Sequence, residues 1–340
     1  MKRLLSMNVL VMVVFFLTVL LGFNTGESRA AKKIQIKFTT IQMPKQQMGK
    51  AALKLGKWVN SELGDRVQMK IYTSAQLYRG KEEIEALMRG EIEMSFVIGS
   101  RLETIDPTLQ CFKLPYLFTN VDVAYKLLDG PLGKELFKKL PPVNLQFLGL
   151  VHSGNVLFSN AKRPLKVPED FKGLKIRSYG RMGKDTAAFL GATAVVTPSS
   201  ETFSALQTGV IDGVMTPNSV YLKRKYNTIQ KYVTDGGLAN FTNSALLANL
   251  KFWNGLPDDI RSKLKGLIDK LTGEMRAEMK EENKKIFDDI RAAGNEVHHL
   301  TPEEVAAWKK ALQPLYDKYV PEIGADLIAK MEKEIARLSQ

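Results

Sequence analysis

The sequence predicts an α/β protein of two similar lobes, with a hinge between them and one long helix bridging both. Three observations predict this fold. A helix–glycine–strand pattern occurs twice, similar strands and helices precede both copies, and a stretch with helical periodicity is longer than one lobe.

The repeated pattern places a glycine between the end of a helix and the start of an apolar strand. In the first copy Gly90 leads into strand Met94–Ile98, and in the second, 119 residues later, Gly209 leads into strand Val214–Thr216. Glycine suits this position because the residue after a helix often needs a positive φ. The alternative is that helix–glycine–strand, which is common in α/β proteins, recurs here by chance.

Matching elements precede the two copies. The first follows strand Ile34–Thr39, helix Lys45–Glu62 and strand Val67–Tyr72, and the second follows strand Leu174–Ser178, helix Arg181–Leu190 and strand Ala194–Val196. Two βαβαβ halves of this kind form a crevice at the carboxyl ends of their strands, where open α/β sheets bind ligands. Residues 149–151 are expected to form a strand near the crossing between the lobes.

The segment Pro257–Ala293 has apolar residues three or four positions apart and no proline after its first residue. As a single helix, the 36 residues after Pro257 would extend about 54 Å at about 1.5 Å per residue, which exceeds the length of one lobe. We expect it to bridge both lobes; the alternative is two helices broken at Gly273. A helical region, Pro302 to Arg337, is expected to end the chain.

The expected organisation begins with a secretory signal peptide at residues 1–30. Lys2 and Arg3 precede an apolar run, and Ser28-Arg29-Ala30 places small residues at −3 and −1 of a cleavage site. Lobe I is expected to take residues 31–152 with about 240–270, and lobe II residues 153–239 with about 271–300. Residues 301–340 are expected to form a C-terminal helical region.

Composition narrows the class of protein. The formal net charge of +13 favours anionic solutes, but the basic residues are spread along the chain and do not predict nucleic-acid binding. Cys111, the one cysteine, lies in an apolar run and is expected to be buried. The three histidines fit no metal-ligand spacing, and no Walker, GxSxG or GxGxxG motif occurs. We therefore expect no cofactor, no metal and no catalysis.

Several longer motifs occur in a family-specific order. They are Pro168–Arg177, then Phe189-Leu190-Gly191-Ala192, then Glu201 to Gly213, with Leu114–Phe118 and Leu128–Leu136 earlier in the chain. On these segments the chain resembles the extracytoplasmic solute-binding proteins of tripartite ATP-independent periplasmic (TRAP) transporters, the DctP family. The resemblance covers about residues 34 to 300.

The resemblance implies a periplasmic-binding-protein-like fold that closes on an organic acid and delivers it to a two-part membrane permease. It implies a periplasmic location, and after signal removal the protein itself is not expected to span a membrane. In such proteins the arginine that ends Lys-Ile-Arg pairs with the solute carboxylate, and here that residue is Arg177. The residue chemistry agrees, because a guanidinium presents a planar fork that fits a carboxylate.

Two departures from the family pattern bear on the ligand. Val156 stands where many members carry a second cleft arginine, and Thr216 stands where asparagine is usual. A less basic cleft favours a monocarboxylate with an apolar or modestly polar body. Five of the remaining predicted ligand residues lie in loops or at strand ends, and they are Gln42, Gln76, Asn155, Met215 and Asn218. Phe203 is predicted to supply an aromatic wall. Each polar residue is as likely to be an ordinary polar loop residue as a ligand contact, and Phe203 could instead belong to the hydrophobic core.

An alternative function is that of a ligand-sensing protein, which presents its solute to a membrane receptor.

Overall fold

The computed structural model describes residues 33–80, 82–118, 120–198 and 200–340. The predicted signal peptide therefore lies outside the described residues. The chain divides into two compact units, Met1–Ile34 and Gln35–Gln340, and everything below concerns the second. Within the described ranges, none of the helices combines the length and the apolar character that crossing a bilayer requires.

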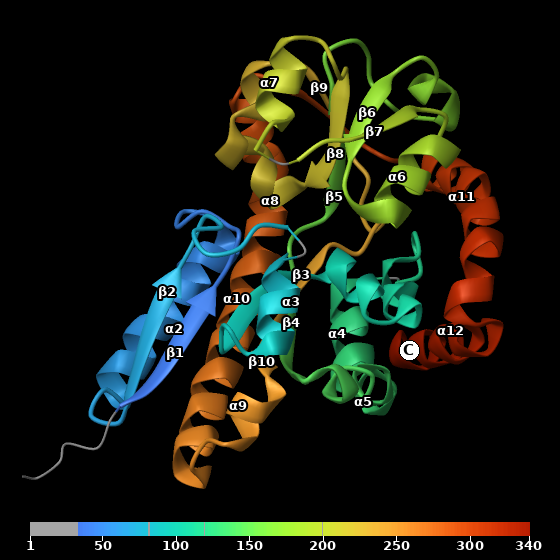
Figure 1. Ribbon diagram of the computed structural model, residues 1–340. Helices are drawn as coiled ribbons and strands as arrows, with labels where there is room; N and C mark the ends of the chain where they lie inside the picture. The colour runs from blue at the N-terminus through green and yellow to red at the C-terminus, as the bar shows by residue number, and fades with distance from the viewer. Residues whose placement is uncertain (1–32, 81, 119, 199) are drawn as a thin grey trace, which may run out of the picture. The chain divides into compact units, whose positions relative to one another are not determined.

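Two sheets carry the fold (Figure 1). The first, which we call the lobe I sheet, has the order β2-β1-β3-β10-β4 and contains β1 (Ile34–Thr39), β2 (Val67–Tyr72), β3 (Met94–Ile98), β4 (Leu145–His152) and β10 (Asn243–Asn249). The second, the lobe II sheet, has the order β11-β9-β5-β8-β6-β7 and contains β5 (Val156–Asn160), β6 (Lys175–Ser178), β7 (Thr193–Val196), β8 (Gly213–Pro217), β9 (Tyr232–Asp235) and β11 (Glu296–His299).

The two sheets correspond strand for strand, apart from the added β11. Reading the second sheet from its other edge gives β7-β6-β8-β5-β9, so β1 corresponds to β6 and β3 to β8. In both sheets the fourth strand is antiparallel to the third. That strand is exchanged, because β5 follows the crossing out of lobe I and β10 follows the crossing back. The predicted two-lobe α/β fold is confirmed.

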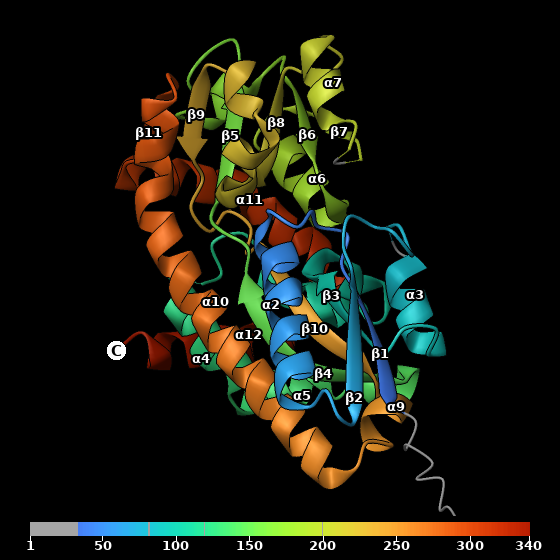
Figure 2. The ribbon, with the colours of Figure 1, turned by 90° about the vertical axis from the view of Figure 1, so that its left-hand side faces the viewer.

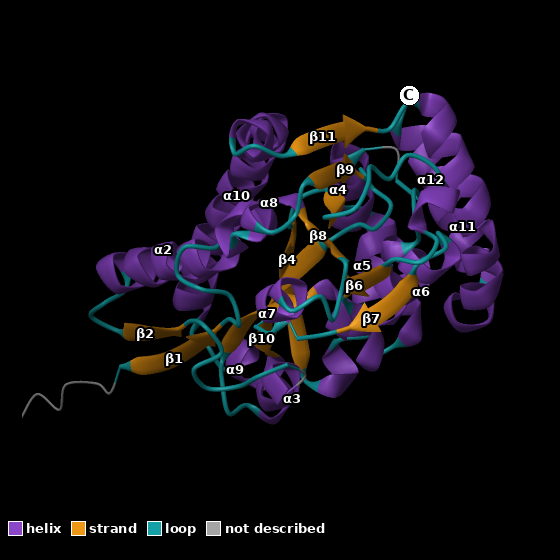
Figure 3. Ribbon diagram, turned by 90° about the horizontal axis from the view of Figure 1, so that it is seen from above, coloured by secondary structure: helices purple, strands orange, loops and turns teal. Residues whose placement is uncertain are grey.

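Helices cover these sheets. They are α2 (Gln47–Glu62), α3 (Glu82–Arg89), α4 (Val121–Asp129) and α5 (Pro131–Phe137) in the first part of the chain, and α6 (Gly180–Phe189), α7 (Thr202–Gln207), α8 (Asn218–Tyr221) and α9 (Leu250–Asn254) after it. The C-terminal helices are α11 (Pro302–Ile323) and α12 (Ala325–Leu338). Figure 3 lets the reader follow both sheets from above.

The long helix α10 (Asp258–Ala292) runs unbroken through Gly273, as Figure 2 shows. It contacts α2 and β4 of lobe I and α8 and β11 of lobe II, so the predicted bridging helix is confirmed. Its buried side chains recur at helical spacing; Leu264, Ile268, Leu271, Met275 and Met279 are examples. The alternative of two helices is wrong, because a single glycine costs about 1 kcal/mol and the packing on both lobes outweighs it.

We expect Gly273→Ala to raise the free energy of unfolding by about 0.5–1 kcal/mol. No heavy atom lies within 4 Å of the position that the new Cβ would take. Gly209→Ala is the matched control, because its Cβ also meets open space but its φ is +71°. Urea unfolding should show the control destabilised; a destabilised Gly273→Ala would contradict a continuous helix.

The predicted C-terminal helical region contains α11 and α12, and its contacts reach both lobes. The helix α11 contacts α6 of lobe II and the 3₁₀ helix η2 (Pro107–Lys113) of lobe I, and α12 packs on α4. Glu322 of α11 accepts a hydrogen bond from Gln110 of η2 at 3.0 Å and pairs with Arg181 of α6. We keep the predicted lobe boundaries as a proposal and treat α11 and α12 as common to the two lobes.

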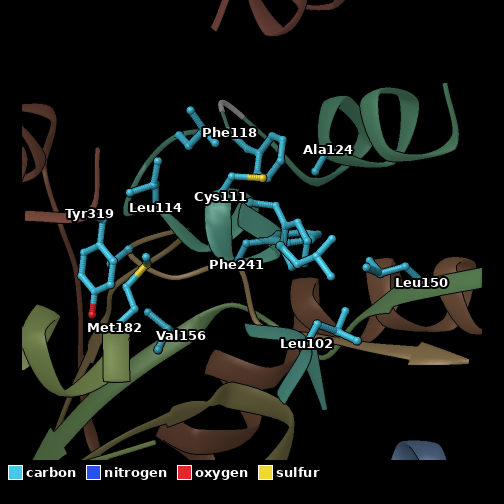
Figure 4. Packing of buried hydrophobic residues seen from close by; sticks show 14 of the residues in the cluster. Leu102, Cys111, Leu114, Phe118, Ala124, Leu150, Val156, Met182, Phe241 and Tyr319 are labelled. Carbon is cyan, nitrogen blue, oxygen red and sulfur yellow. The ribbon is translucent and has the colours of Figure 1, made fainter. Parts of the chain in front are cut away.

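The main hydrophobic core is continuous across these elements. It includes Leu102 and Phe241, Val156 and Met182, and Tyr319 from α11 (Figure 4). Cys111 lies in this core with no exposed surface, as expected. Burial raises the pKa of its thiol to about 12, so the thiolate that nucleophilic chemistry requires does not form near neutral pH.

Candidate functional site

Two segments cross between the lobes and are hydrogen-bonded to each other. Residues 153–155 lead from β4 to β5, and residues 236–242 lead from β9 back to β10. The Ser153 amide donates to the Thr242 carbonyl at 2.9 Å, and the Val156 amide donates to the Gly237 carbonyl at 3.0 Å. These bonds make the crossings a single hinge at the ends of both sheets.

Arg177 lies near the carboxyl end of β6, between Val195 of β7 and Val214 of β8 in the register of the sheet. Its side chain is on the face that carries the lobe II cluster, which we define as the buried residues around Leu157, Val214, Tyr221 and Tyr226. Adjacent residues in register share a face, so the guanidinium is directed to that side and not to α6.

The environment of Arg177 is enclosed. The residue is 5% exposed, and its Nε donates to the Thr197 carbonyl at 3.0 Å. The Tyr179 ring centroid lies 5.9 Å from its Cζ. Burial lowers the pKa of Arg177, which means that the surroundings disfavour an unneutralised cation. An anion bound at this edge of the sheet would therefore be held by a strong, poorly screened attraction.

Thr216 and Phe203 lie on the same side as Arg177. Thr216 is buried and opposite Leu157 of β5, and it is two residues from Val214 along β8. Phe203 of α7 is half-buried and packs against the lobe II cluster. The structure therefore brings these three predicted ligand residues to one face.

Met215 lies on the opposite face of β8. It is fully buried in the main hydrophobic core, where it is in register with Phe158. Alternation along a strand sends neighbouring residues to opposite faces, so Thr216 and Met215 cannot both face the same ligand. We therefore leave Met215 out of the proposed site.

Asn155 and Asn218 belong to the hinge. The backbone amide of Asn218 donates to the backbone carbonyl of Asn155 at 2.8 Å. The side-chain Nδ2 of Asn218 donates to the Oδ1 of Asn283, in α10, at 2.9 Å. Gly154 has a φ of +107°, and a Cβ there would lie 2.2 Å from the Asn218 Oδ1. Both asparagines thus fix the crossing segment to the long helix.

Gln42 and Gln76 follow the ends of β1 and β2 in lobe I. The Gln42 Oε1 accepts from the Met48 amide at 3.1 Å, so this side chain satisfies a donor at the start of α2. Gln76 is exposed, with its backbone amide bonded to the Thr73 carbonyl. Both residues thus make hydrogen bonds to neighbouring backbone groups. Their contact with a ligand stays a prediction.

Sequence reasoning missed an ion pair at the carboxyl edge of the lobe I sheet. Arg101, in the 3₁₀ helix η1 (Gly99–Thr104), donates from its Nη1 to the Oε2 of Glu83 at 3.1 Å. Glu83 is 1% exposed, and its Oε1 accepts from the Thr39 hydroxyl at 3.1 Å. The signal was present, since Arg101 comes three residues after the end of β3 and Glu83 lies inside the repeated pattern.

Two cavities lie away from these residues. One, of about 550 Å³, is lined by α4, α5, β4 and α10 residues such as Lys134, Phe147 and Arg276. The other, of about 400 Å³, lies among α2, α10 and Lys223. None of the predicted ligand residues lines either one, so the candidate site rests on the enclosed edges of the two sheets.

Two observations on the described residues bear on metal binding and on acid–base chemistry. No group of three His, Cys, Asp or Glu side chains within them could hold a metal ion. His152 is fully buried and stacked on Phe241, and burial lowers its pKa to about 3. It therefore stays neutral near pH 7, where a general base would need a pKa close to the working pH.

Comparisons with known proteins agree with the geometry. A sequence model of the DctP family, described as bacterial extracellular solute-binding protein, family 7, matches residues 38–322. A C4-dicarboxylate-binding periplasmic protein DctP from Rhodobacter capsulatus is 34% identical over 312 residues, which cover 90% of this chain and 92% of the relative.

Solved structures agree as well. A TRAP periplasmic solute-binding protein from Sulfurospirillum deleyianum with bound succinate has a TM-score of 0.81 and 30% identity, covering 88% of this chain and 98% of that one. Another, from Ralstonia eutropha with bound (S)-2-acetolactate, has a TM-score of 0.82 and 27% identity, covering 89% and 99%. The resemblance predicted from the sequence motifs is confirmed.

Proposed function

Because the chain belongs to the DctP family of TRAP-transporter solute-binding proteins, we propose that it captures an organic acid between its lobes and delivers it to a membrane permease. One carboxylate of the acid lies on Arg177. Contacts from both lobes then favour the closed form, since a ligand shifts such an equilibrium only through better contacts in one state.

The observation that carries this proposal is the placement of Arg177. It is a buried cation at the carboxyl edge of the lobe II sheet, on the same face as Thr216 and Phe203. A carboxylate offers two oxygens to the planar fork of a guanidinium. The ring of Tyr179 beside it supplies a flat apolar surface for the body of the acid.

The sequence alone favours a monocarboxylate, because Val156 stands where a second arginine is common. Relatives of similar identity carry different acids; succinate has two carboxylates and acetolactate has one. The choice between these two classes depends on whether another cation faces the ligand.

The proposed location is periplasmic, after removal of the signal peptide, with the TRAP membrane subunits as partners. The relatives are solute-binding proteins, and we propose that this chain likewise performs no catalysis. The neutral His152 and the buried Cys111 support that proposal, because neither has the protonation state that acid–base or nucleophilic catalysis requires.

The test is a thermal-shift screen of the mature protein against a library of organic acids, in parallel with Arg177→Ala. At least one acid should raise the melting temperature of the wild-type protein and leave that of the variant unchanged. Equal shifts in both proteins would refute a carboxylate anchor at Arg177. Uptake of the same acid into vesicles that contain the permease subunits would distinguish transport from presentation to a receptor.

A further inference from the structure

We propose that Glu322 of α11 is a clasp between the two lobes, which stabilises their closed arrangement and is broken when they separate. Its carboxylate is bound from lobe I by Gln110 and from lobe II by Arg181. The inference rests on the proposed function, because closure is the movement that captures a solute. None of the three clasp residues is a predicted ligand residue, so the clasp can be tested without an acid.

The two lobes touch beside this clasp. Gly180, which begins α6, has a φ of +67°, and a Cβ there would lie 3.2 Å from the Cβ of Ser100 in η1. It would also lie 3.8 Å from the Nζ of Lys113 in η2, whose side chain is only 3% exposed. A residue other than glycine would be strained at this φ and would crowd Ser100. Gly180 therefore permits a close contact of the lobes that excludes solvent.

The carboxylate of Glu322 binds groups on both sides of this contact. Its Oε2 accepts a hydrogen bond from the Nε2 of Gln110 at 3.0 Å, and its Oε1 accepts one from the Nη1 of Arg181 at 2.7 Å. The Nη2 of Arg181 donates to the Oε2 as well, so the arginine holds the carboxylate with two parallel bonds. Because Gln110 has no exposed surface, its end of the clasp is fixed within lobe I.

The helix that carries Glu322 is attached to both lobes. The Tyr319 hydroxyl donates to the Oδ2 of Asp185, in α6 of lobe II, at 2.7 Å. The Tyr316 hydroxyl donates to the carbonyl of Pro115, which follows η2 in lobe I, at 2.9 Å. The lobes therefore cannot separate at this side unless α11 bends or loses its contacts with one of them.

Two prolines give α11 places to bend. Pro314 lies inside the helix, and so does Pro321, directly before Glu322. A proline has no N–H, so the carbonyls of Lys310 and Asp317, four residues earlier, lack their usual helical donor. Sharp bends in helices occur mainly at such positions. The last turns of α11 can therefore move relative to its start, and the contacts of Glu322 are the ones that this movement breaks.

A neighbouring ion pair provides a matched comparison. The Nζ of Lys318 lies 2.7 Å from the Oδ2 of Asp185, and this pair joins α11 to α6 of lobe II. The Lys318 side chain is 48% exposed and that of Arg181 is 47% exposed, so solvent screens both cations to a similar degree. Loss of the Lys318 pair should leave the balance between open and closed lobes unchanged, because the pair does not reach lobe I.

The test measures the distance between the lobes by pulsed electron paramagnetic resonance. Spin labels are attached at Glu85→Cys in α3 and Ser204→Cys in α7, which are exposed and equivalent positions of the repeated pattern. Cys111 has no exposed surface and stays unlabelled. Without added acid, Glu322→Gln should lower the ratio of closed to open protein about 3-fold, as expected for one half-exposed ion pair. Lys318→Gln should leave that ratio unchanged.

Two further measurements separate the clasp from a general effect on the fold. Glu322→Arg alone should favour the open form, and the exchanged variant Arg181→Glu/Glu322→Arg should recover at least half of that change. The amide of Gln110 can turn its oxygen towards the new cation. Raising the salt concentration from about 0.05 M to about 1 M should shift the wild-type distances towards those of Glu322→Gln, because salt screens the pair. This last measurement needs no substitution at the clasp.

Identical distance distributions in the wild-type protein and Glu322→Gln would overturn the inference. So would an equal shift in Lys318→Gln, because the effect would then belong to the attachment of α11 to lobe II, or a salt effect that is as large in Glu322→Gln as in the wild-type protein. These outcomes are separate from failure of the proposed function, which would appear as acid binding that survives substitution of Arg177.

Discussion

Replacing Arg177 with methionine should weaken binding of the cognate acid at least 100-fold. The substitution removes the charge and the planar fork but keeps much of the apolar stem. Charge-assisted hydrogen bonds are each worth about 1.5–3 kcal/mol, and the loss of two of them corresponds to about 100-fold or more in Kd. Calorimetric titration with the acid found by the thermal-shift screen measures this directly.

The fold should tolerate this change. Methionine keeps much of the buried stem but loses the bond from the Arg177 Nε to the Thr197 carbonyl, so the free energy of unfolding of the unliganded variant should fall by no more than about 1–3 kcal/mol. Arg177→Lys is the graded comparison, because it keeps the charge but loses the bidentate geometry. Its affinity should fall between those of the other two proteins; a lysine variant with wild-type affinity would show that charge alone is sufficient.

Replacing Trp308 with alanine should lower the free energy of unfolding by about 3–5 kcal/mol. Trp308 of α11 has no exposed surface, and its ring packs edge-on against Phe158 and Phe171, with centroid distances of 5.3 and 5.2 Å. Its Nε1 donates to the Lys166 carbonyl at 2.9 Å, so the substitution also removes this hydrogen bond.

Trp58→Ala provides the comparison for that measurement. Trp58 is half-buried on α2, where Lys54 and Lys270 lie over its ring, and truncation there should cost clearly less. Urea unfolding followed by circular dichroism measures both variants. If the Trp308 variant were as stable as the Trp58 variant, α11 would not be an integral part of the main hydrophobic core.

The fold was largely predictable from the sequence, because the local helix and strand patterns agree with the way the strands pair in the two sheets. Helix–glycine–strand patterns at Gly90 and Gly209 indicate the same unit twice, and the strand order of the two sheets repeats accordingly. The exchange of β5 and β10 between the two sheets was not predicted, because their pairing across the hinge leaves no periodic signal in either segment. The short strand β11 was missed for the same reason, since its partner β9 lies 64 residues earlier in the chain.

The site was predictable in part. Arg177 could be identified because a family motif ends on it, and Thr216 follows from the second repeat. Met215 was predicted to contact the ligand because it lies beside Thr216 at a strand end. Side chains alternate between the two faces of β8, however, and the Met215 side chain lies in the main hydrophobic core. Arg101 was missed because an arginine after a strand is common, and only the fold brings it to the buried Glu83 from 18 positions earlier.

The most direct test of the central claim is a crystal structure of the mature protein with the acid that binds most tightly. A carboxylate of the ligand should lie on the guanidinium of Arg177, with both oxygens within hydrogen-bonding distance of its N–H groups. A ligand carboxylate held elsewhere, for example beside Lys134 in the cavity of about 550 Å³, would contradict it.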